Sequence, residues 1–113
     1  MPRMNFVLQY GTIVVGSVVE AFQSDDTWFG KFLPRPPPQS NSALHLRLLT
    51  FIAFCRDWHS RLASGLEPNA TEFDSFRDIL ASGLWQAVGS DGAIRAIREA
   101  PVFIGADISW RLG

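Results

Sequence analysis

The sequence has little chemistry that depends on cysteine or histidine. Among its 113 residues are one cysteine, Cys55, and two histidines, His45 and His59. A lone cysteine excludes an intramolecular disulfide and a multi-cysteine metal site, and it favours a reducing compartment. On one continuous helix the two histidines would lie about 21 Å apart along the axis, too far to share an ion. We therefore expect no metal, no cofactor and a cytoplasmic location.

An excess of charge of one sign is also lacking. Ten Lys or Arg stand against eleven Asp or Glu, for a formal net charge of −1. Without a basic excess the chain cannot neutralise several phosphates, which argues against nucleic-acid binding. The glycine-rich phosphate-binding patterns and the nucleophile pattern G-x-S-x-G are absent.

No apolar run is long and clean enough for a membrane span. The most apolar stretch, residues 4–22, is interrupted by Gln9, Thr12 and Glu20, which argues against both a bilayer helix and a secretory signal. A later apolar stretch contains His45 and Arg47. We expect neither a membrane segment nor an export signal.

What the chain does contain is an apolar and aromatic load typical of a folded domain. Apolar residues make up 47% and aromatic residues 12%, with nine Phe and four Trp. This composition predicts one small soluble domain over residues 1–113. Aromatic side chains that such a small core leaves uncovered often mark an interface.

The first third is typical of β-strands. Residues 5–10, 12–22 and 27–33 are rich in β-branched and aromatic types and are separated by turn residues, which predicts an antiparallel meander of three strands. A tight turn is expected at Gly11, and Gly16 suggests a bulge or a bend in the second strand.

A proline-rich connector at 34–41 should end the sheet region, because consecutive prolines cannot donate ladder hydrogen bonds. Asn41 or Ser42 is then expected to cap a long helix over 43–63. The helical spacing comes from apolar residues that recur every three or four positions, among them Leu44, Leu48, Phe51, Ile52 and Cys55. Gly65 is placed to terminate this helix.

A second, shorter helix is predicted over about 72–82. Thr71 and Asp74 have the spacing of a capping box at its start. Strands are expected again near 84–88 and 107–112, whereas residues 91–100 fit either a strand or a helix. The sequence therefore predicts an α+β fold, in which the N-terminal meander and C-terminal strands form an antiparallel sheet with both helices packed on one face.

The stretch FCRDWHSRL brings reactive side chains together on the first helix. Cys55 and His59 are four residues apart and share a face, as a nucleophile and base or half of a metal site would. Cys55 also continues the core stripe of Leu48 and Ile52, and His59 suits the negative end of the helix dipole. We interpret the pair as structural and non-catalytic, and keep Cys55, Trp58 and His59 as candidate ligand-binding residues.

The charges suggest a second candidate surface. Four acids (Glu67, Glu72, Asp74 and Asp78) against Arg77 give −4 + 1 = −3 over residues 67–78. The first helix carries three Arg against Asp57, or +3 − 1 = +2. These charges either cancel between the helices or form a solvated face that steers a partner.

The expected function follows from these absences and this polarity. A non-catalytic protein-interaction module is favoured: a binding, inhibitor or immunity-type protein, or a subunit of a complex. Its partner would be a protein or a second copy in a homodimer, with Glu72, Asp74, Asp78 and Trp28 as candidate contacts. The alternative is a small enzyme or ligand-binding domain with a pocket near Cys55 and His59.

Overall fold

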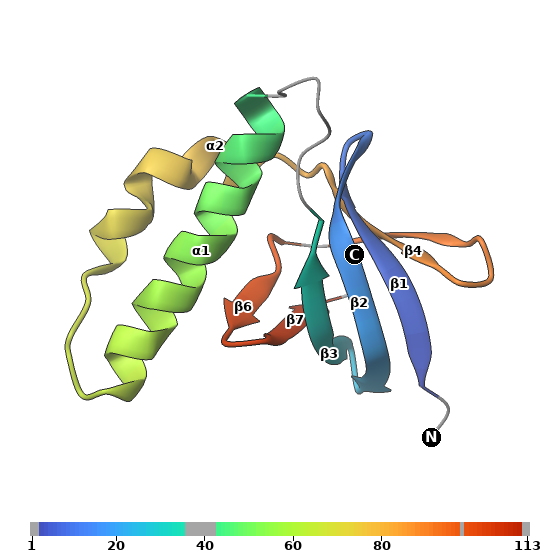
Figure 1. The fold of residues 1–113 in the computed structure, drawn as a ribbon, viewed down its shortest axis with the longest axis horizontal. Coiled ribbons are helices and arrows are strands. Elements are labelled where there is room, and N and C mark those ends of the chain that lie inside the picture. The colour runs from blue at the N-terminus through green and yellow to red at the C-terminus, as the bar shows by residue number, and fades with distance from the viewer. Residues whose placement is uncertain (1–2, 36–42, 98, 112–113) are drawn as a thin grey trace.

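The computed structural model describes residues 3–35, 43–97 and 99–111. Figure 1 shows a sheet with a helical arm at its side. The elements are β1 (Met4–Tyr10), β2 (Ile13–Ser24), β3 (Thr27–Pro34), α1 (Ala43–Ala63), the 3₁₀ helix η1 (Ala70–Phe76), α2 (Arg77–Leu80), β4 (Trp85–Gly89), β5 (Ile94–Ala96), β6 (Val102–Ile104) and β7 (Asp107–Arg111).

The strands form one antiparallel sheet in the order β5-β4-β1-β2-β3-β7-β6. The predicted meander β1–β3 lies at its centre, and the C-terminal strands add two hairpins, one on each side. The turn between β1 and β2 contains Gly11 at φ 60°, a left-handed conformation that glycine adopts without steric cost. The ambiguous region 91–100 contributes β5, so its strand interpretation is the correct one.

The sheet is curled, and irregularities in β2 accompany the curl. The pairing of β1 with β2 shifts register between Leu8, opposite Gly16, and Gln9, opposite Val14. This bulge confirms the irregularity predicted at Gly16. A Cβ on Gly16 would lie 2.4 Å from the Leu33 carbonyl oxygen and 2.6 Å from the Phe32 ring, so only glycine permits this close approach.

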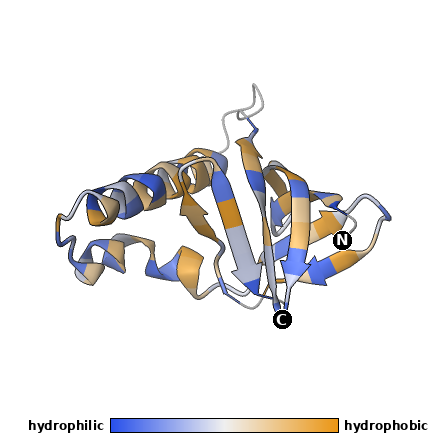
Figure 2. Ribbon diagram, turned by 90° about the horizontal axis from the view of Figure 1, so that it is seen from below, coloured by the Kyte–Doolittle hydropathy of each residue, from blue (hydrophilic) through white to orange (hydrophobic). Residues whose placement is uncertain are grey.

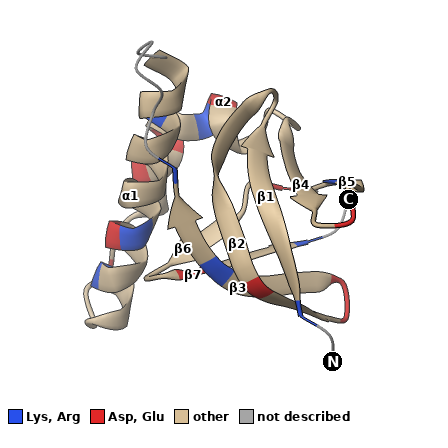
Figure 3. Cartoon of the chain, turned by 45° about the vertical axis from the view of Figure 1, so that its right-hand side comes forward, with Lys and Arg blue, Asp and Glu red and all other residues tan. Residues whose placement is uncertain are grey.

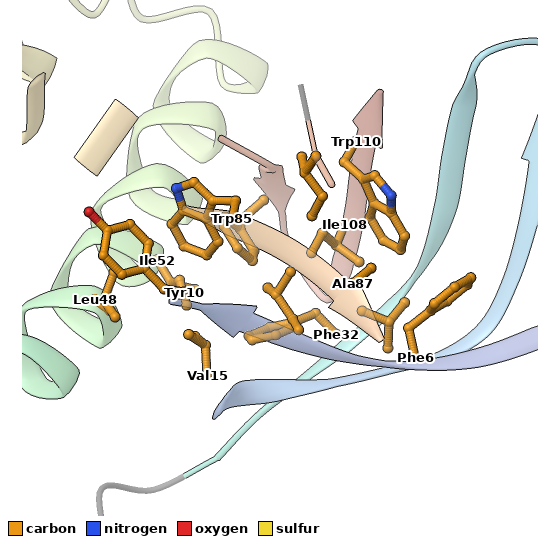
Figure 4. Packing of buried hydrophobic residues seen from close by; sticks show 14 of the residues in the cluster. Phe6, Tyr10, Val15, Phe32, Leu48, Ile52, Trp85, Ala87, Ile108 and Trp110 are labelled. Atoms are coloured by element: carbon orange, nitrogen blue, oxygen red, sulfur yellow. The ribbon is translucent and has the colours of Figure 1, made fainter. Parts of the chain in front are cut away.

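The concave face of the sheet and one face of α1 share a single hydrophobic core. Figure 4 shows Trp85 and Tyr10 near Leu48 and Ile52 of α1. The Trp85 indole is accommodated inside because its Nε1 donates to the Ile79 carbonyl at 3.1 Å. Figure 2 shows hydrophobic and hydrophilic segments interleaved along the strands, the pattern of a sheet with one buried face. The predicted α+β class and the two helices on one face are confirmed.

Helix α1 has the predicted bounds and the predicted C-terminal glycine. Gly65 has φ 85°, and the Leu66 N–H donates to the Arg61 carbonyl at 3.0 Å. At the other end, His45 Nε2 lies 3.2 Å from the Arg35 carbonyl oxygen, which ties the helix to the end of β3. The cap predicted at Asn41 or Ser42 and residues 36–41 of the connector lie outside the described residues.

The second helical segment differs from its prediction in start and type. It begins as the 3₁₀ helix η1 and becomes α-helical only at α2. The predicted capping box of Thr71 and Asp74 was wrong, because the box is formed two residues earlier. The Asn69 side chain accepts from the Thr71 N–H at 3.0 Å, and the Glu72 carboxylate accepts from the Asn69 N–H at 3.0 Å.

Candidate functional site

Cys55 lies where the core interpretation placed it. Its side chain is 3% exposed among the apolar residues of α1 and the sheet. Burial raises the pKa of the thiol to about 12, because a thiolate would lose its hydration there. At neutral pH the nucleophilic thiolate is therefore almost absent, and the geometry does not favour a Cys55–His59 catalytic pair.

Cys55 and His59 nevertheless line the same hollow. This hollow, which we call the helix cavity, has a volume of about 490 Å³ and lies between α1, the η1–α2 segment and residues 99–102. Its apolar wall includes Phe51, Cys55, Phe73, Leu80 and Pro101. Among the residues that the structure describes, its ionisable groups besides the thiol are His59 and Glu99.

Trp58, the third candidate ligand residue, lies beside the helix cavity and has a packing role. Its ring contacts those of Phe73 and His59 edge to face, with centroids 5.2 and 5.1 Å apart. Its Nε1 donates to the Asn69 carbonyl at 3.4 Å. Trp58 thus joins the end of α1 to the start of η1, and its ligand-binding role stays a prediction.

The acidic candidates form ion pairs within the helical arm, which consists of α1, η1 and α2. Figure 3 shows both basic and acidic residues there. Glu72 accepts from Arg61 at 2.8 Å, and this contact lowers the pKa of the Glu72 carboxyl. Asp78 pairs with Arg47, which lowers its pKa to about 2. Much of the charge on the two helices therefore cancels, one of the two alternatives open from the sequence. Whether Glu72 and Asp78 also contact a partner stays a prediction.

The other two candidate partner residues lie in different surroundings. Asp74 is exposed and pairs with Arg77 of the next turn at 3.0 Å. Trp28 is only 7% exposed and packs edge to face against Phe6, with centroids 4.9 Å apart. Trp28 is therefore a core residue, away from the solvent-facing side of β3.

The convex face of the sheet carries a groove that sequence reasoning missed. This outer groove, of about 410 Å³, crosses β2, β3, β7 and β6. Its walls include Phe22, Phe29, Val102 and Ile104, which are 39%, 39%, 41% and 51% exposed. Phe22 and Phe29 are direct cross-strand partners and stack with their centroids 5.6 Å apart.

The strand register builds the groove from two rows of side chains. In one row, Phe29 is opposite Phe22 on one side and Ser109 on the other, and Ser109 is opposite Val102. In the second row, Asp107 lies between Lys31 and Ile104. Exposed apolar side chains on β2, β3 and β6 thus line one groove, and Ser109 and Asp107 of β7 lie between its two walls.

Charged side chains border the outer groove. Glu20, at φ 55° in the bulge of β2, lies 3.9 Å from both Arg3 and Lys31, and Figure 3 shows this acidic segment of β2 beside the basic segment of β3. Asp107 also lines the groove but forms no ion pair with the described residues. Among the described residues, the border therefore carries two cations, Arg3 and Lys31, and two anions, Glu20 and Asp107. Glu20 is paired with both cations, whereas Asp107 is paired with neither.

Residues 3–35, 43–97 and 99–111 contain no group of three or more His, Cys, Asp or Glu side chains arranged to hold a metal ion. Within the same residues, no helix combines the length and apolar character needed to cross a bilayer. A scan of protein-family models and searches of curated proteins and solved structures find no match to this chain.

Proposed function

We propose that this protein is a non-catalytic interaction module that assembles with a second copy of its own chain through the outer groove. The observation that carries the proposal is the set of exposed apolar side chains on β2, β3 and β6 that line the outer groove on both sides of β7. Two phenyl rings and two branched aliphatic side chains face solvent there. Exposed apolar side chains that gather in one groove, unlike ones scattered singly, are typical of contact surfaces.

The charges at the border of the groove favour a second copy as the occupant. Glu20 is shared by Arg3 and Lys31, which leaves one cation in excess. Asp107 supplies an anion without an ion-pair partner among the described residues. In a two-fold symmetric contact each copy presents the same patch, so Asp107 of one copy can meet Lys31 or Arg3 of the other twice over.

The chemistry near Cys55 supports a non-catalytic role. The thiol is buried and protonated at neutral pH, so an enzyme built on it lacks its nucleophile. A lone, protonated cysteine also suits the cytoplasmic location that we continue to propose.

Sedimentation equilibrium over a range of concentrations tests the assembly, with wild-type protein compared with Ile104→Lys and Ile94→Lys. Both isoleucines are exposed on short edge strands, β6 and β5, at 51% and 66%, so the second variant is a matched control for the first. We expect a dimer for the wild type and for Ile94→Lys. For Ile104→Lys we expect a monomer, because two added ammonium groups would face each other in the apolar contact.

Three outcomes would contradict the proposal. A monomeric wild type at all concentrations removes the second copy as occupant. A dimer that survives Ile104→Lys places the contact elsewhere on the molecule. Dissociation by Ile94→Lys instead would assign the contact to the β5 edge. Circular dichroism of both variants excludes unfolding as the cause.

A further inference from the structure

The helix cavity has the size and lining of a small-molecule site, and among the described residues it shares only Val102 with the outer groove proposed above as a contact. Its volume of about 490 Å³ falls within the roughly 300–1,000 Å³ typical of ligand pockets. Phe51 and Cys55 are buried at its base, while Phe73 and Leu80 are partly exposed at its sides. An apolar body of one ring or a short chain would cover surface that the fold leaves open.

The polar groups that line the cavity, His59 and Glu99, take no part in the ion pairs between the helical segments. Arg61 is occupied by Asp57 and Glu72 at 3.0 and 2.8 Å. Glu99, by contrast, forms no ion pair with the described residues, and the His59 ring packs edge to face against Trp58, with centroids 5.1 Å apart. Within the described residues neither side chain is held in an ion pair, so each can offer a hydrogen bond to a polar group on a ligand.

The negative charge of Glu99 indicates which class of ligand the cavity would accept. Glu99 is an anion at neutral pH, and no Lys or Arg among the described residues lines the cavity. A carboxylate at the opening of an apolar cavity favours an ammonium group, to which it offers a charge-assisted hydrogen bond. Phe73, an aromatic residue of the same lining, belongs to the class of side chains that also attract cations. An anionic ligand would meet repulsion from Glu99 and would find no Lys or Arg in the described part of the lining.

We propose that the helix cavity binds a small primary amine with an apolar body, its ammonium group on Glu99 and its body against Phe51, Phe73 and Leu80. His59 lines the same cavity and offers a second hydrogen-bonding group to the ligand. No covalent step is involved, because the buried thiol serves only as apolar lining.

Titration of the ¹⁵N-labelled protein with phenethylamine, followed by NMR, tests this site. The matched ligand is 3-phenylpropionate, which has the same body with an anionic head. The matched variants are Glu99→Gln and Glu67→Gln, since Glu67 is exposed and outside the cavity lining. We expect saturable shifts at the cavity residues with phenethylamine, an affinity about tenfold weaker in Glu99→Gln, and no change in Glu67→Gln.

The proposal is overturned if phenethylamine gives no saturable shifts at cavity residues, if 3-phenylpropionate binds as tightly, or if Glu99→Gln binds as the wild type does. Because Glu99 is exposed, its replacement should leave the fold intact, and the unperturbed remainder of the spectrum verifies this. The result is independent of assembly, since the monomeric Ile104→Lys variant keeps the cavity and should bind the amine equally well.

Discussion

Arg47 of α1 donates to both carboxylate oxygens of Asp78 in α2, across 31 positions of the chain. The same guanidinium donates to the Ser75 carbonyl at 2.8 Å. Together with the Arg61–Glu72 pair, this contact joins α1 to the η1–α2 segment. The polar side of the helical arm is therefore a connection between its two segments as well as a solvated surface.

The Arg47–Asp78 pair should make stability depend on pH in the acidic range. In the folded state, the hydrogen bond from Arg47 lowers the pKa of the Asp78 carboxyl from 3.8 to about 2. A lowered carboxyl pKa means that the stabilisation is complete above about pH 3.8 and is lost as pH falls toward 2. Asp78→Asn should therefore melt a few degrees below wild type at neutral pH, and this difference should shrink as pH falls through that window.

Asp74→Asn is the control for this measurement, because Asp74 pairs only with the exposed Arg77 one turn away. Thermal melts of the three proteins between neutral pH and pH 2 provide the comparison. A wild-type advantage over Asp78→Asn that stays constant with pH would contradict the assigned role of the carboxylate.

The start of the 3₁₀ helix should depend on Asn69 and not on Thr71. The Asn69 side chain accepts a backbone hydrogen bond at the helix start, while the Thr71 backbone is the donor. Loss of an N-cap side chain costs about 1 kcal/mol, so Asn69→Ala should lower the free energy of unfolding by about that amount. Thr71→Ala, which removes no cap, should cost only a few tenths. Urea denaturation measures the free energy of unfolding of both variants. Equal losses of stability would contradict the assignment of the cap to Asn69.

The elements that could be predicted from the sequence are those with local causes. Turn residues and alternating apolar positions locate β1 to β3, and the three-to-four spacing locates α1 to the residue. The capping box was misplaced because Asn69 with Glu72 and Thr71 with Asp74 fit the same pattern. The longer Glu72 side chain reaches back to the Asn69 N–H, and only the structure reveals which pair closes.

The outer groove could not be predicted, because it depends on a bulge and on distant pairing. Strict alternation from Val18 would place Phe22 on the buried face. The extra residue between Val19 and Phe22, where Glu20 adopts a positive φ, shifts the alternation and turns Phe22 outward. The other wall comes from Val102 and Ile104, which reach the groove only because β7 pairs with β3.

Replacement of Gly16 should destabilise the curled sheet. An added methyl group would meet the Leu33 carbonyl oxygen at 2.4 Å, and a backbone atom cannot move aside cheaply. We expect Gly16→Ala to cost about 1–3 kcal/mol. Gly89→Ala is the matched control, since the nearest atoms there are the mobile ends of Asp91 and Arg95. Chemical denaturation of both variants checks the difference, and equal stabilities would contradict the close packing at Gly16.

Cys55 provides the sharpest test of whether FCRDWHSRL is core or active site. The thiol is 3% exposed with its pKa raised to about 12 by burial, so a thiol reagent should modify it only when the chain opens. The labelling rate should therefore rise with urea in step with unfolding. Rapid labelling of the native protein, at a rate that follows a thiolate with a lowered pKa, would instead indicate a reactive site.

Two substitutions of Cys55 separate packing from charge. Cys55→Ala removes one buried sulfur and should cost about 1 kcal/mol. Cys55→Asp places a carboxylate among Leu48, Phe51 and Ile52 without a cation beside it, and should cost about 3–5 kcal/mol. Because an uncharged carboxyl is cheaper to bury, the penalty for Cys55→Asp should fall as pH is lowered toward the pKa of the new carboxyl. An aspartate tolerated as well as alanine at neutral pH would mean that water reaches this position, and the cavity beside it would then be wetter than its apolar lining implies.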